Sequence, residues 1–403
     1  MSPRRGDSLP TVWPRPAHTK AKHDILVKYL QAWFAIMGGS RYDQKVGVFD
    51  GFAGPGLYDD GEPGSPVLVV DALLGHDYFS RWTDTEFIFL FNEVDPDRYA
   101  SLEKVVEGLT TRWSPWPKNV KVRSENRAFS ELAEEMLAGV KGLIPLFAFI
   151  DPFGYRDIPM DLIRRMLQYD KAELFIYFDF NSVNRFAGKG VVDHRFEELF
   201  GCDDFYDAPA SGPARKAFLH DLYERQLRTE CSMAYVRSFE MVNESGHVGN
   251  HLFFCTRDLQ AFDRMKAAMW KLAPAGDYRF EDQLAGQEVL FGDELDTGPL
   301  QDDVANHFAG RTVSIQEVLS YVIAETPYHS GQVKVKTLKP MQTAGRISAP
   351  GQRRRGPVPR RHSDRVSLDC RERRHLVPGP AVEFAAVCFG RASPPLLEEE
   401  CDA

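Results

Sequence analysis

The feature that most constrains this chain is a short apolar segment that ends in an acid and runs straight into a glycine-rich turn. Residues 48–50 read Val-Phe-Asp, and Gly51, Gly54 and Gly56 follow. Glycine takes positive φ angles easily and lets the backbone approach a ligand closely. Open α/β sheets bind ligands beyond the carboxyl ends of their strands. The segment therefore predicts the first strand of a doubly wound, Rossmann-like α/β sheet, with a ligand at its end.

The spacing of the glycines selects among ligands. A dinucleotide site uses Gly-x-Gly-x-x-Gly before a helix, whereas this chain has Gly-x-x-Gly-x-Gly preceded by an acid. The turn resembles the first motif of class I S-adenosylmethionine-dependent methyltransferases, often written Asp-x-Phe-x-Gly-x-Gly. The resemblance implies S-adenosylmethionine as cofactor, and a structural glycine turn is the alternative. The implied cofactor-binding residues of the turn are Asp50, Gly51, Phe52, Ala53, Gly54 and Gly56.

Further apolar runs follow in the order that such a fold requires. A strand covered on both faces reads as a continuous apolar run. The runs lie at residues 87–91, 120–122, 146–150 and 173–180. Glu93 follows the first of them, where a carboxylate can accept both ribose hydroxyls, although a solvated acid is the alternative. Asn126 follows the second, where a methyltransferase would contact the adenine.

The run at 146–150 ends in Asp151-Pro152-Phe153-Gly154-Tyr155. This turn resembles the catalytic motif of amino-group methyltransferases, in which a side-chain oxygen and a main-chain carbonyl hold the target amine. The resemblance implies that Asp151, Phe153 and Tyr155 face the acceptor, with the two rings stacked on a base. Methyl transfer requires mainly alignment and exclusion of water.

The same turn departs from the family pattern, which is usually Asp-Pro-Pro-Tyr. Phe153 replaces the second proline, which puts amino methylation of a base in doubt. Cytosine carbon-5 methylation is excluded more firmly, because it needs a Cys nucleophile at that position. The alternative for Asp151 is a structural one, in which its carboxylate caps the helix expected at about residues 159–168 or closes a turn.

The last parts of the pattern are a hairpin and a small helical module. Residues 234–242 and 251–256 predict an antiparallel hairpin, which makes a zinc site at His247 and His251 unfavourable. Residues 314–323 predict a capped helix and about 330–343 a second one. Two short helices suggest a helix-turn-helix or winged module, with nucleic-acid contacts on the second helix from Lys334, Lys336 and Lys339.

Composition places limits on the class of protein. The net charge of −9 argues against nonspecific coating of nucleic acid. Six cysteines without a Cys-x-x-Cys pair indicate a reduced, cytoplasmic setting. The sequence contains no run of about 18 apolar residues, so no membrane span is predicted. A helical stripe at residues 22–33 would cover the cofactor cleft, with Lys20 or His23 near the cofactor's carboxylate.

Several of these segments together resemble one family, the three-Cys-motif partner (TcmP) proteins. The resemblance rests on Lys22-His23-x-Ile-Leu, the turn at 50–56, Gly64-Ser65-Pro66, residues 150–154 and Thr326-Pro327-Tyr328. It spans roughly residues 20–347. It implies a methyltransferase-like fold and a partner protein that carries three cysteines in a motif suggestive of radical chemistry. The family resemblance leaves the reaction open.

The resemblance ends after Ile347, where the second half of a wing is expected. The chain continues with a Pro- and Arg-rich stretch at 351–362 that has no strand or helix periodicity. We hypothesise a reading-frame shift near Arg355, which resequencing of the gene would test. The predicted organisation is a basic arm at 1–20, a methyltransferase-like domain at 21–300, a winged-helix-like module at 301–347 and a basic, Pro- and Arg-rich tail at 348–403, which is expected to be disordered or frame-shifted.

Two functions from different classes fit these patterns. The first is an S-adenosylmethionine-dependent methyltransferase that acts on nucleic acid or a nucleotide-like substrate together with the three-cysteine protein. The second is a module that binds cofactor and nucleic acid without chemistry and recruits substrate for that partner. Fold analogy alone does not decide between them.

Overall fold

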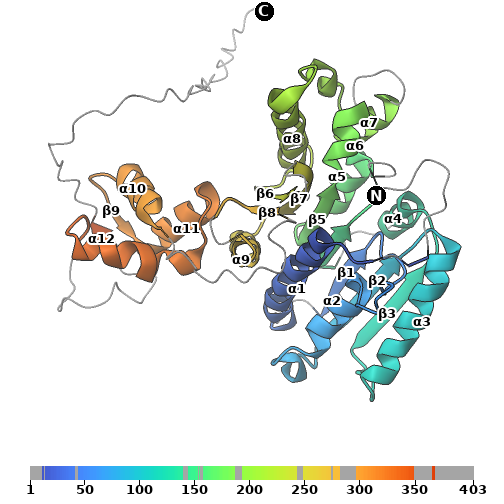
Figure 1. The fold of residues 1–403 in the computed structure, drawn as a ribbon. Helices are drawn as coiled ribbons and strands as arrows, with labels where there is room; N and C mark the ends of the chain where they lie inside the picture. Colours follow the sequence, from blue (N-terminus) through green and yellow to red (C-terminus); the bar gives the residue numbers. More distant parts are fainter. Residues whose placement is uncertain are drawn as a thin grey trace, which may run out of the picture.

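The structure is a computed structural model of the 403-residue chain. It describes residues 11–12, 14–40, 44–138, 144–152, 154, 158–186, 193–242, 248–273, 276–281, 296–348 and 365–367. A large α/β unit carries one broad sheet, and a smaller helical module lies beside its β6–β8 edge (Figure 1).

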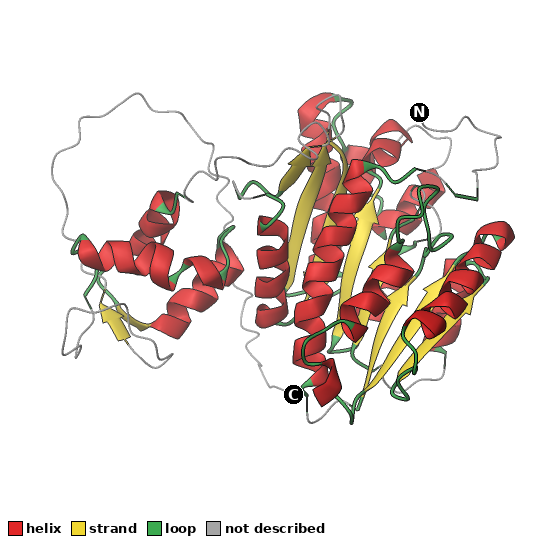
Figure 2. Cartoon of the chain, turned by 60° about the horizontal axis from the view of Figure 1, so that its bottom comes forward, coloured by secondary structure: helices red, strands yellow, loops and turns green. Residues whose placement is uncertain are grey.

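The α/β unit contains an eight-stranded sheet in the order β3-β2-β1-β4-β5-β7-β6-β8 (Figure 2). Strands β1 to β5 pair in parallel, and β7 runs antiparallel to both β5 and β6. The chain reverses its direction of winding between β1 and β4, which is where ligands bind in open α/β sheets. The strands are β1 (Lys45–Asp50), β2 (Glu86–Asn92), β3 (Val120–Glu125), β4 (Leu146–Ile150), β5 (Ala172–Phe178), β6 (Tyr235–Val242), β7 (Val248–Thr256) and β8 (Arg279–Glu281).

Helices cover both faces of this sheet. One face packs against α1 (Ala17–Gly38), α2 (Ser65–Leu74), α3 (Pro96–Arg112) and α9 (Leu259–Trp270). The other packs against α4 (Phe129–Leu137), α5 (Met160–Leu167), α6 (Phe180–Phe186), α7 (Asp193–Phe200) and α8 (Gly212–Thr229). Short 3₁₀ turns lie at Phe79–Arg81 and Asp204–Asp207. The doubly wound architecture predicted from the sequence is therefore confirmed.

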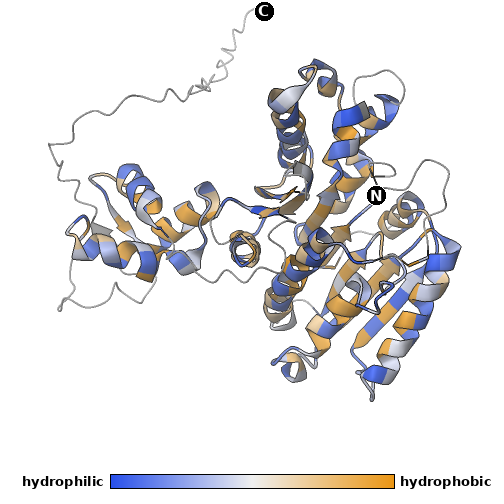
Figure 3. Cartoon of the chain, in the orientation of Figure 1, coloured by the Kyte–Doolittle hydropathy of each residue, from blue (hydrophilic) through white to orange (hydrophobic). Residues whose placement is uncertain are grey.

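The apolar runs form strands because both of their faces are covered. Every residue of β4 and β5 is buried. Successive side chains of a strand point to opposite faces, so Phe147 and Phe149 join the core under α1 while Ala148 and Ile150 join the core on the α5 side. The strands are accordingly mainly apolar in Figure 3, and the helices carry polar outer surfaces.

The C-terminal module has a core of its own. It consists of α10 (Gly298–His307), β9 (Thr312–Ser314), α11 (Ile315–Glu325), a 3₁₀ turn at Ser330–Gln332, a π-helical turn at Lys334–Leu338 and α12 (Lys339–Thr343). The Ser314 hydroxyl accepts from the Glu317 amide and the Glu317 carboxylate accepts from the Ser314 amide, which confirms the predicted capped helix.

The module differs from the expectation in two details. Its second helix is not one α-helix, because the backbone passes from a 3₁₀ turn through a π-helical turn into α12. Within the stretch expected to lack regular structure, β10 (Arg365–Ser367) pairs antiparallel with β9. The frame-shift hypothesis concerns residues 349–364 and 368–403, which lie outside the described part of the chain.

Polar contacts from α9 attach the module to the α/β unit. The side chain of Lys266 is fully buried, and its Nζ atom donates to the carbonyl oxygens of Val322, Ile323 and Thr326 at 3.4, 2.8 and 2.7 Å. The Asp263 carboxylate accepts from the amide and hydroxyl of Ser330 at 2.7 and 2.6 Å. Lys266 and Asp263 are buried on α9 and are hydrogen-bonded to the module. These bonds hold the module in a defined position on α9.

Candidate methyl-donor and acceptor site

The glycine turn after β1 has the shape that its sequence predicts. Gly54 and Gly56 have φ angles of 64° and 80°, which L side chains rarely adopt. A Cβ atom on Gly51 would lie 2.7 Å from the Phe129 ring, and one on Gly64 would lie 2.9 Å from the Gly56 carbonyl oxygen. The turn is thus packed too closely for any side chain at these positions.

The buried carboxylate of Asp50 stabilises the turn through hydrogen bonds. Its side chain is 1% exposed, and its two oxygens accept from the Phe52 amide at 3.2 Å and the Ser65 hydroxyl at 2.6 Å. Burial raises the pKa of Asp50 to about 7, while the bonds from Ser65 and Phe52 act in the opposite direction. Asp50 therefore ties the end of β1 to the first residue of α2 and shapes the ligand-facing backbone.

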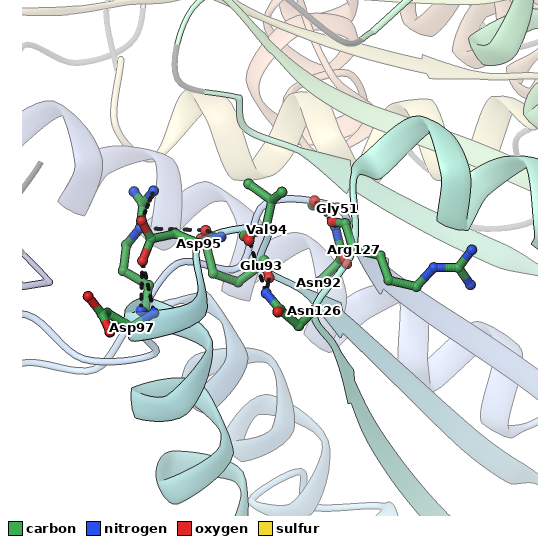
Figure 4. Close-up of polar contacts among 9 residues, drawn as sticks. Gly51, Asn92, Glu93, Val94, Asp95, Asp97, Asn126 and Arg127 are labelled. Atoms are coloured by element: carbon green, nitrogen blue, oxygen red, sulfur yellow. Dashed lines mark hydrogen bonds and ion pairs between the residues drawn. The ribbon is translucent and has the colours of Figure 1, made fainter. Parts of the chain in front are cut away.

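Glu93 lies at the carboxyl end of β2, beside this turn (Figure 4). Its side chain is buried, and one oxygen accepts from the Asp95 amide at 2.8 Å and lies 3.5 Å from Arg98 Nε. Burial raises the pKa of Glu93, and the hydrogen bonds and Arg98 lower it. The carboxylate is held at the place where a nucleoside ribose is expected.

The predicted adenine-side residue, Asn126, holds the loop that carries Glu93. The Asn126 amide donates to the carbonyl oxygens of Glu93 at 2.7 Å and Val94 at 3.0 Å (Figure 4). This loop contains one of the most exposed large apolar side chains among the described residues, because Val94 is 54% exposed. The structure therefore places Asn126 beside the candidate cofactor site in a role that orders the backbone.

Asn92 is a residue of this site that sequence analysis missed. Its buried amide donates to the carbonyl oxygens of Gly51 at 3.2 Å and Arg127 at 3.0 Å (Figure 4). It links the residues that follow β1 and β3 to the last residue of β2. The sequence did indicate such a role, because Asn92 is the last residue of an apolar run. A polar side chain at that position is buried and therefore needs hydrogen-bond partners.

Asp151 lies at the end of β4 and is paired with a lysine from α1. Lys22 Nζ lies 2.9 and 2.6 Å from the two oxygens of Asp151 and 4.1 Å from the centre of the Tyr177 ring. The side chains of Lys22 and Asp151 are 6% and 19% exposed. Asp151 does not cap a helix, since Pro159 occupies the N-cap position of α5. Phe153 and Tyr155 lie outside the described residues.

Lys20 and His23 were predicted as site residues of this helix, whereas Lys22 was not. Lys20 is exposed and pairs with Asp24 at 2.8 Å on the outer face of α1. A signal for Lys22 was present, because it precedes Ile25, Leu26 and Tyr29 at helical spacing on the buried stripe. A lysine on an apolar stripe requires a buried partner, and Asp151 supplies it.

A second polar chain extends from this pair toward β7. With its amide oriented to satisfy both neighbours, the Asn250 nitrogen donates to Asp179 Oδ1 at 3.1 Å and its oxygen accepts from the Tyr177 hydroxyl. The other carboxylate oxygen of Asp179 accepts from the Ser182 hydroxyl at 2.6 Å. Tyr177 therefore lies between the Lys22–Asp151 pair and a hydrogen-bonded group at the ends of β5 and β7.

His23 offers a polar atom that no described residue satisfies. Its side chain is 4% exposed, and within the described part of the chain its Nδ1 atom has no hydrogen-bond partner. Its ring lies 6.1 Å from that of Tyr58, which follows the glycine turn. Burial, and then the charges of Lys22 and Arg15, lower the pKa of His23 to about 3. His23 is thus a neutral imidazole whose Nδ1 atom has no hydrogen-bond partner among the described residues.

This orphaned nitrogen and the crowded glycine backbone fit a polar nucleoside-type cofactor. Burial, and then the charge of Asp151, raise the pKa of the Tyr58 hydroxyl, with a smaller contribution in the same direction from Asp50. Among the described residues, no cluster of three or more His, Cys, Asp and Glu side chains could hold a metal ion.

A cavity of about 640 Å³ lies away from this site. It is lined by the C-terminal half of α1 and the start of α9, including Trp33, Met37 and Ala261, and by Glu173 near the amino end of β5. Both oxygens of Glu173 already accept hydrogen bonds, from the hydroxyls of Tyr29 and Thr256. Ligands of parallel sheets bind at the opposite, carboxyl ends, so this cavity is separate from the candidate site.

Comparisons with known proteins add fold-level likenesses only. No family model matches the chain, and no curated protein matches its sequence. A Legionella pneumophila protein, LPL1258 of family-model DUF519, aligns at 14% identity over 60% of this chain and 86% of its own, with a TM-score of 0.37. The methyltransferase domain of METTL16 aligns at 12% identity over 57% and 66%, with a TM-score of 0.29.

Both scores lie below 0.5, so the fold assignment rests on the sheet itself. The parallel order β3-β2-β1-β4-β5 with an antiparallel β7 between β5 and β6 is that of a class I methyltransferase-like sheet. None of the described helices is both long enough and apolar enough to cross a membrane.

Proposed function

We propose that this protein is an S-adenosylmethionine-dependent methyltransferase that acts on nucleic acid or a nucleotide-like substrate. The observation that carries the proposal is the meeting of three groups at the carboxyl ends of neighbouring strands: the close-packed glycine turn after β1, Glu93 after β2 and Asp151 after β4. Such an arrangement suits a nucleoside cofactor on the β1–β2 side and an acceptor on the β4 side.

The residues of the chain have separable tasks in this proposal. Asp50 and Ser65 keep the turn in the shape that lets its backbone approach the cofactor, and Glu93 accepts hydrogen bonds from the ribose hydroxyls. S-adenosylmethionine, when bound, supplies a methyl group on a sulfonium, so the protein mainly aligns the acceptor and excludes water.

Asp151 has the acceptor-side task. Its partly exposed carboxylate accepts a hydrogen bond from an N–H or O–H group of the acceptor and takes up the proton that leaves it. Lys22 fixes the orientation of that carboxylate from the buried side. Since a carboxylate has about four lone-pair sites, the lysine leaves room for one acceptor contact.

Titration calorimetry with S-adenosylmethionine tests the donor half of the proposal. We expect micromolar binding by the wild type, weakened at least about tenfold by Glu93→Ala because ribose contacts of ordinary strength are lost. Asp50→Ala should weaken binding by distorting the turn. Glu107→Ala, on the exposed face of α3, is the matched control and should bind normally. Absence of binding by the wild type contradicts the proposal.

One observation favours a second function, that of a non-catalytic binding module. Lys22 Nζ contacts both oxygens of Asp151, which reduces the capacity of the carboxylate to hold an acceptor. A protein of this kind would bind S-adenosylmethionine but transfer no methyl group. Incubation with methyl-labelled donor and nucleic acid distinguishes the two, since labelled product appears only with an enzyme.

We also propose a three-cysteine-motif protein as the partner. The support is the TcmP-like set of segments in the sequence, including Thr326-Pro327-Tyr328, whose Pro327 carbonyl accepts from Trp270 Nε1 at 2.9 Å at the junction of the module and α9. Co-expression with a three-cysteine-motif protein encoded next to the gene, followed by size-exclusion chromatography, tests this. Separate elution of the two proteins contradicts it.

A further inference from the structure

The lysines of the C-terminal module are concentrated in one segment, whereas its two arginines, Arg311 and Arg346, lie outside that segment. Residues 296–348 contain three lysines, and all of them lie in the helical segment 334–343. The five acids of the module lie elsewhere, on the segment before α10, on α10 itself and on α11: Asp296, Asp302, Asp303, Glu317 and Glu325. One helix of the module is therefore basic although the module as a whole is not.

The lysines of this segment are available to a ligand. Lys336 and Lys339 are exposed and Lys334 is half-buried. Within the described part of the chain, none of the three forms an ion pair. Arg346, just beyond the segment, differs because it pairs with Asp302 at 2.7 Å. The three lysine side chains are therefore not engaged in ion pairs within the described part of the chain and are open to an anionic ligand.

The segment is amphipathic and well anchored. Val333, Thr337, Leu338 and Met341 are buried in the module core, and the Thr337 hydroxyl donates to the Gln332 carbonyl at 2.9 Å. The opposite side exposes Lys336, Lys339 and Thr343 together with Val335. Val335 is 68% exposed, the highest value among the large apolar side chains described as exposed. The exposed face thus carries one apolar side chain, Val335, between Lys334 and Lys336.

Such a face suits the major groove of B-form DNA. The groove is wide enough to admit a helix, the lysines would contact phosphates, and a valine can pack on a thymine methyl group. The major groove of duplex RNA is too deep and narrow for side chains to read. The geometry therefore favours DNA over RNA as the duplex.

We propose that residues 334–343 form a DNA-contacting helix and that the module binds B-form duplex DNA through this face. The role of that DNA as methyl acceptor rests on the proposed function, whereas the binding itself does not. The bonds from Asp263 to Ser330 and from Lys266 to the end of α11 fix the helix relative to the α/β unit, so bound DNA would be presented to the sheet in a constant position.

Fluorescence anisotropy of the full chain with a labelled 20-base-pair DNA duplex, without methyl donor, tests the proposal. We compare the wild type with Lys336→Ala/Lys339→Ala and with Val335→Glu. The control is Lys104→Ala/Lys118→Ala, which removes two exposed lysines from α3 and the loop before β3. Circular dichroism confirms that each variant is folded.

The double-lysine variant should bind on the order of tenfold more weakly, and its slope of log affinity against log salt should be shallower by about 2. Val335→Glu should also weaken binding, while the control should match the wild type. Equal weakening by both lysine pairs, equal affinity for a duplex RNA of the same length, or no binding at low salt would each overturn the proposal. The donor titration is unaffected by any of these results, so failure here is distinct from failure of the methyltransferase proposal.

Discussion

At the residue scale, the pair formed by Lys22 and Asp151 is the most informative contact of the molecule. It joins the first helix to the end of β4 across 129 positions of sequence. A buried ion pair contributes little net stability, but removing one partner leaves an uncompensated charge. The pair is therefore a sensitive place to separate folding from chemistry.

We expect Lys22→Met to abolish methyl transfer while leaving the affinity for S-adenosylmethionine within about twofold, because the contacts of Lys22 Nζ are with Asp151 and the Tyr177 ring. The free energy of unfolding of the variant should also fall by about 2 kcal/mol. This loss is smaller than that expected for a fully buried ion pair, because the Asp151 side chain is 19% exposed. Lys20→Met breaks only the exposed pair with Asp24 and should cost less than about 1 kcal/mol. Urea denaturation and a labelled-methyl assay measure the two effects.

Asp50 gives a second residue-scale prediction, on pH. Burial raises the pKa of Asp50 from 3.8 to about 7. The folded state therefore holds a proton between about pH 4 and 7 that the unfolded state releases, so the contribution of Asp50 to stability decreases as pH rises through this range. Asp50→Asn removes the titration, and the difference in unfolding free energy between wild type and variant should fall by about 3 kcal/mol from pH 4.5 to pH 7.5. A difference that is constant with pH would contradict the burial of an acid with a raised pKa.

At the element scale, the parallel strands could be predicted from sequence and the functional contacts could not. Residues 146–150 read as a strand because both of their faces are buried, so composition and structure coincide. The capped start of α11 was visible because Ser314 and Glu317 are local partners. Lys22 with Asp151, and Asn250 with Asp179, are distant in sequence and meet only once the sheet has formed.

The module shows the same limit in another form. Its second helix was predicted as one element, but the chain takes a 3₁₀ turn and a π-helical turn before α12. The reason lies in tertiary contacts, since the Ser330 amide and hydroxyl bind Asp263 of α9 while Val333 and Leu338 enter the module core. Helical periodicity carries no information on such competing contacts.

Lys266 provides the prediction at this scale. Its Nζ atom donates to three carbonyl oxygens at and just after the end of α11. Lys266→Met should remove this donor from the Ile323 and Thr326 oxygens, while the Val322 oxygen still accepts from the Thr326 hydroxyl. The loss should cost about 2 kcal/mol, seen as faster amide hydrogen exchange in α11 with little change in β4 and β5. Lys271→Met, an exposed change at the end of the same helix α9, is the control. Equal exchange in the two variants would show that Lys266 does not hold the module.

At the scale of the whole molecule, the stability of the sheet and the attachment of the C-terminal module depend on pH in opposite directions. Burial raises the pKa of Glu173, inside the sheet, to about 7, and it lowers the pKa of Lys266, at the junction with the module, to about 6. Above the acid's unfolded value, the contribution of Glu173 to stability decreases as pH rises toward 7. The contribution of Lys266 increases as pH rises from about 6 toward the ordinary lysine value of 10.5.

These opposite signs predict that raising pH from 5 to 8 strengthens attachment of the module while it weakens the sheet near β5. In Glu173→Gln the weakening near β5 should disappear, because glutamine does not titrate. Its oxygen can accept from one of the Tyr29 and Thr256 hydroxyls, and its NH2 group can donate to the oxygen of the other. In Lys266→Met the pH dependence at α11 should disappear instead. Amide exchange corrected for its intrinsic pH dependence resolves both elements in one experiment. If each substitution flattened the response of both elements, the sheet and the module would unfold as one cooperative unit, and the contacts of Asp263 and Lys266 would transmit stability through the whole chain.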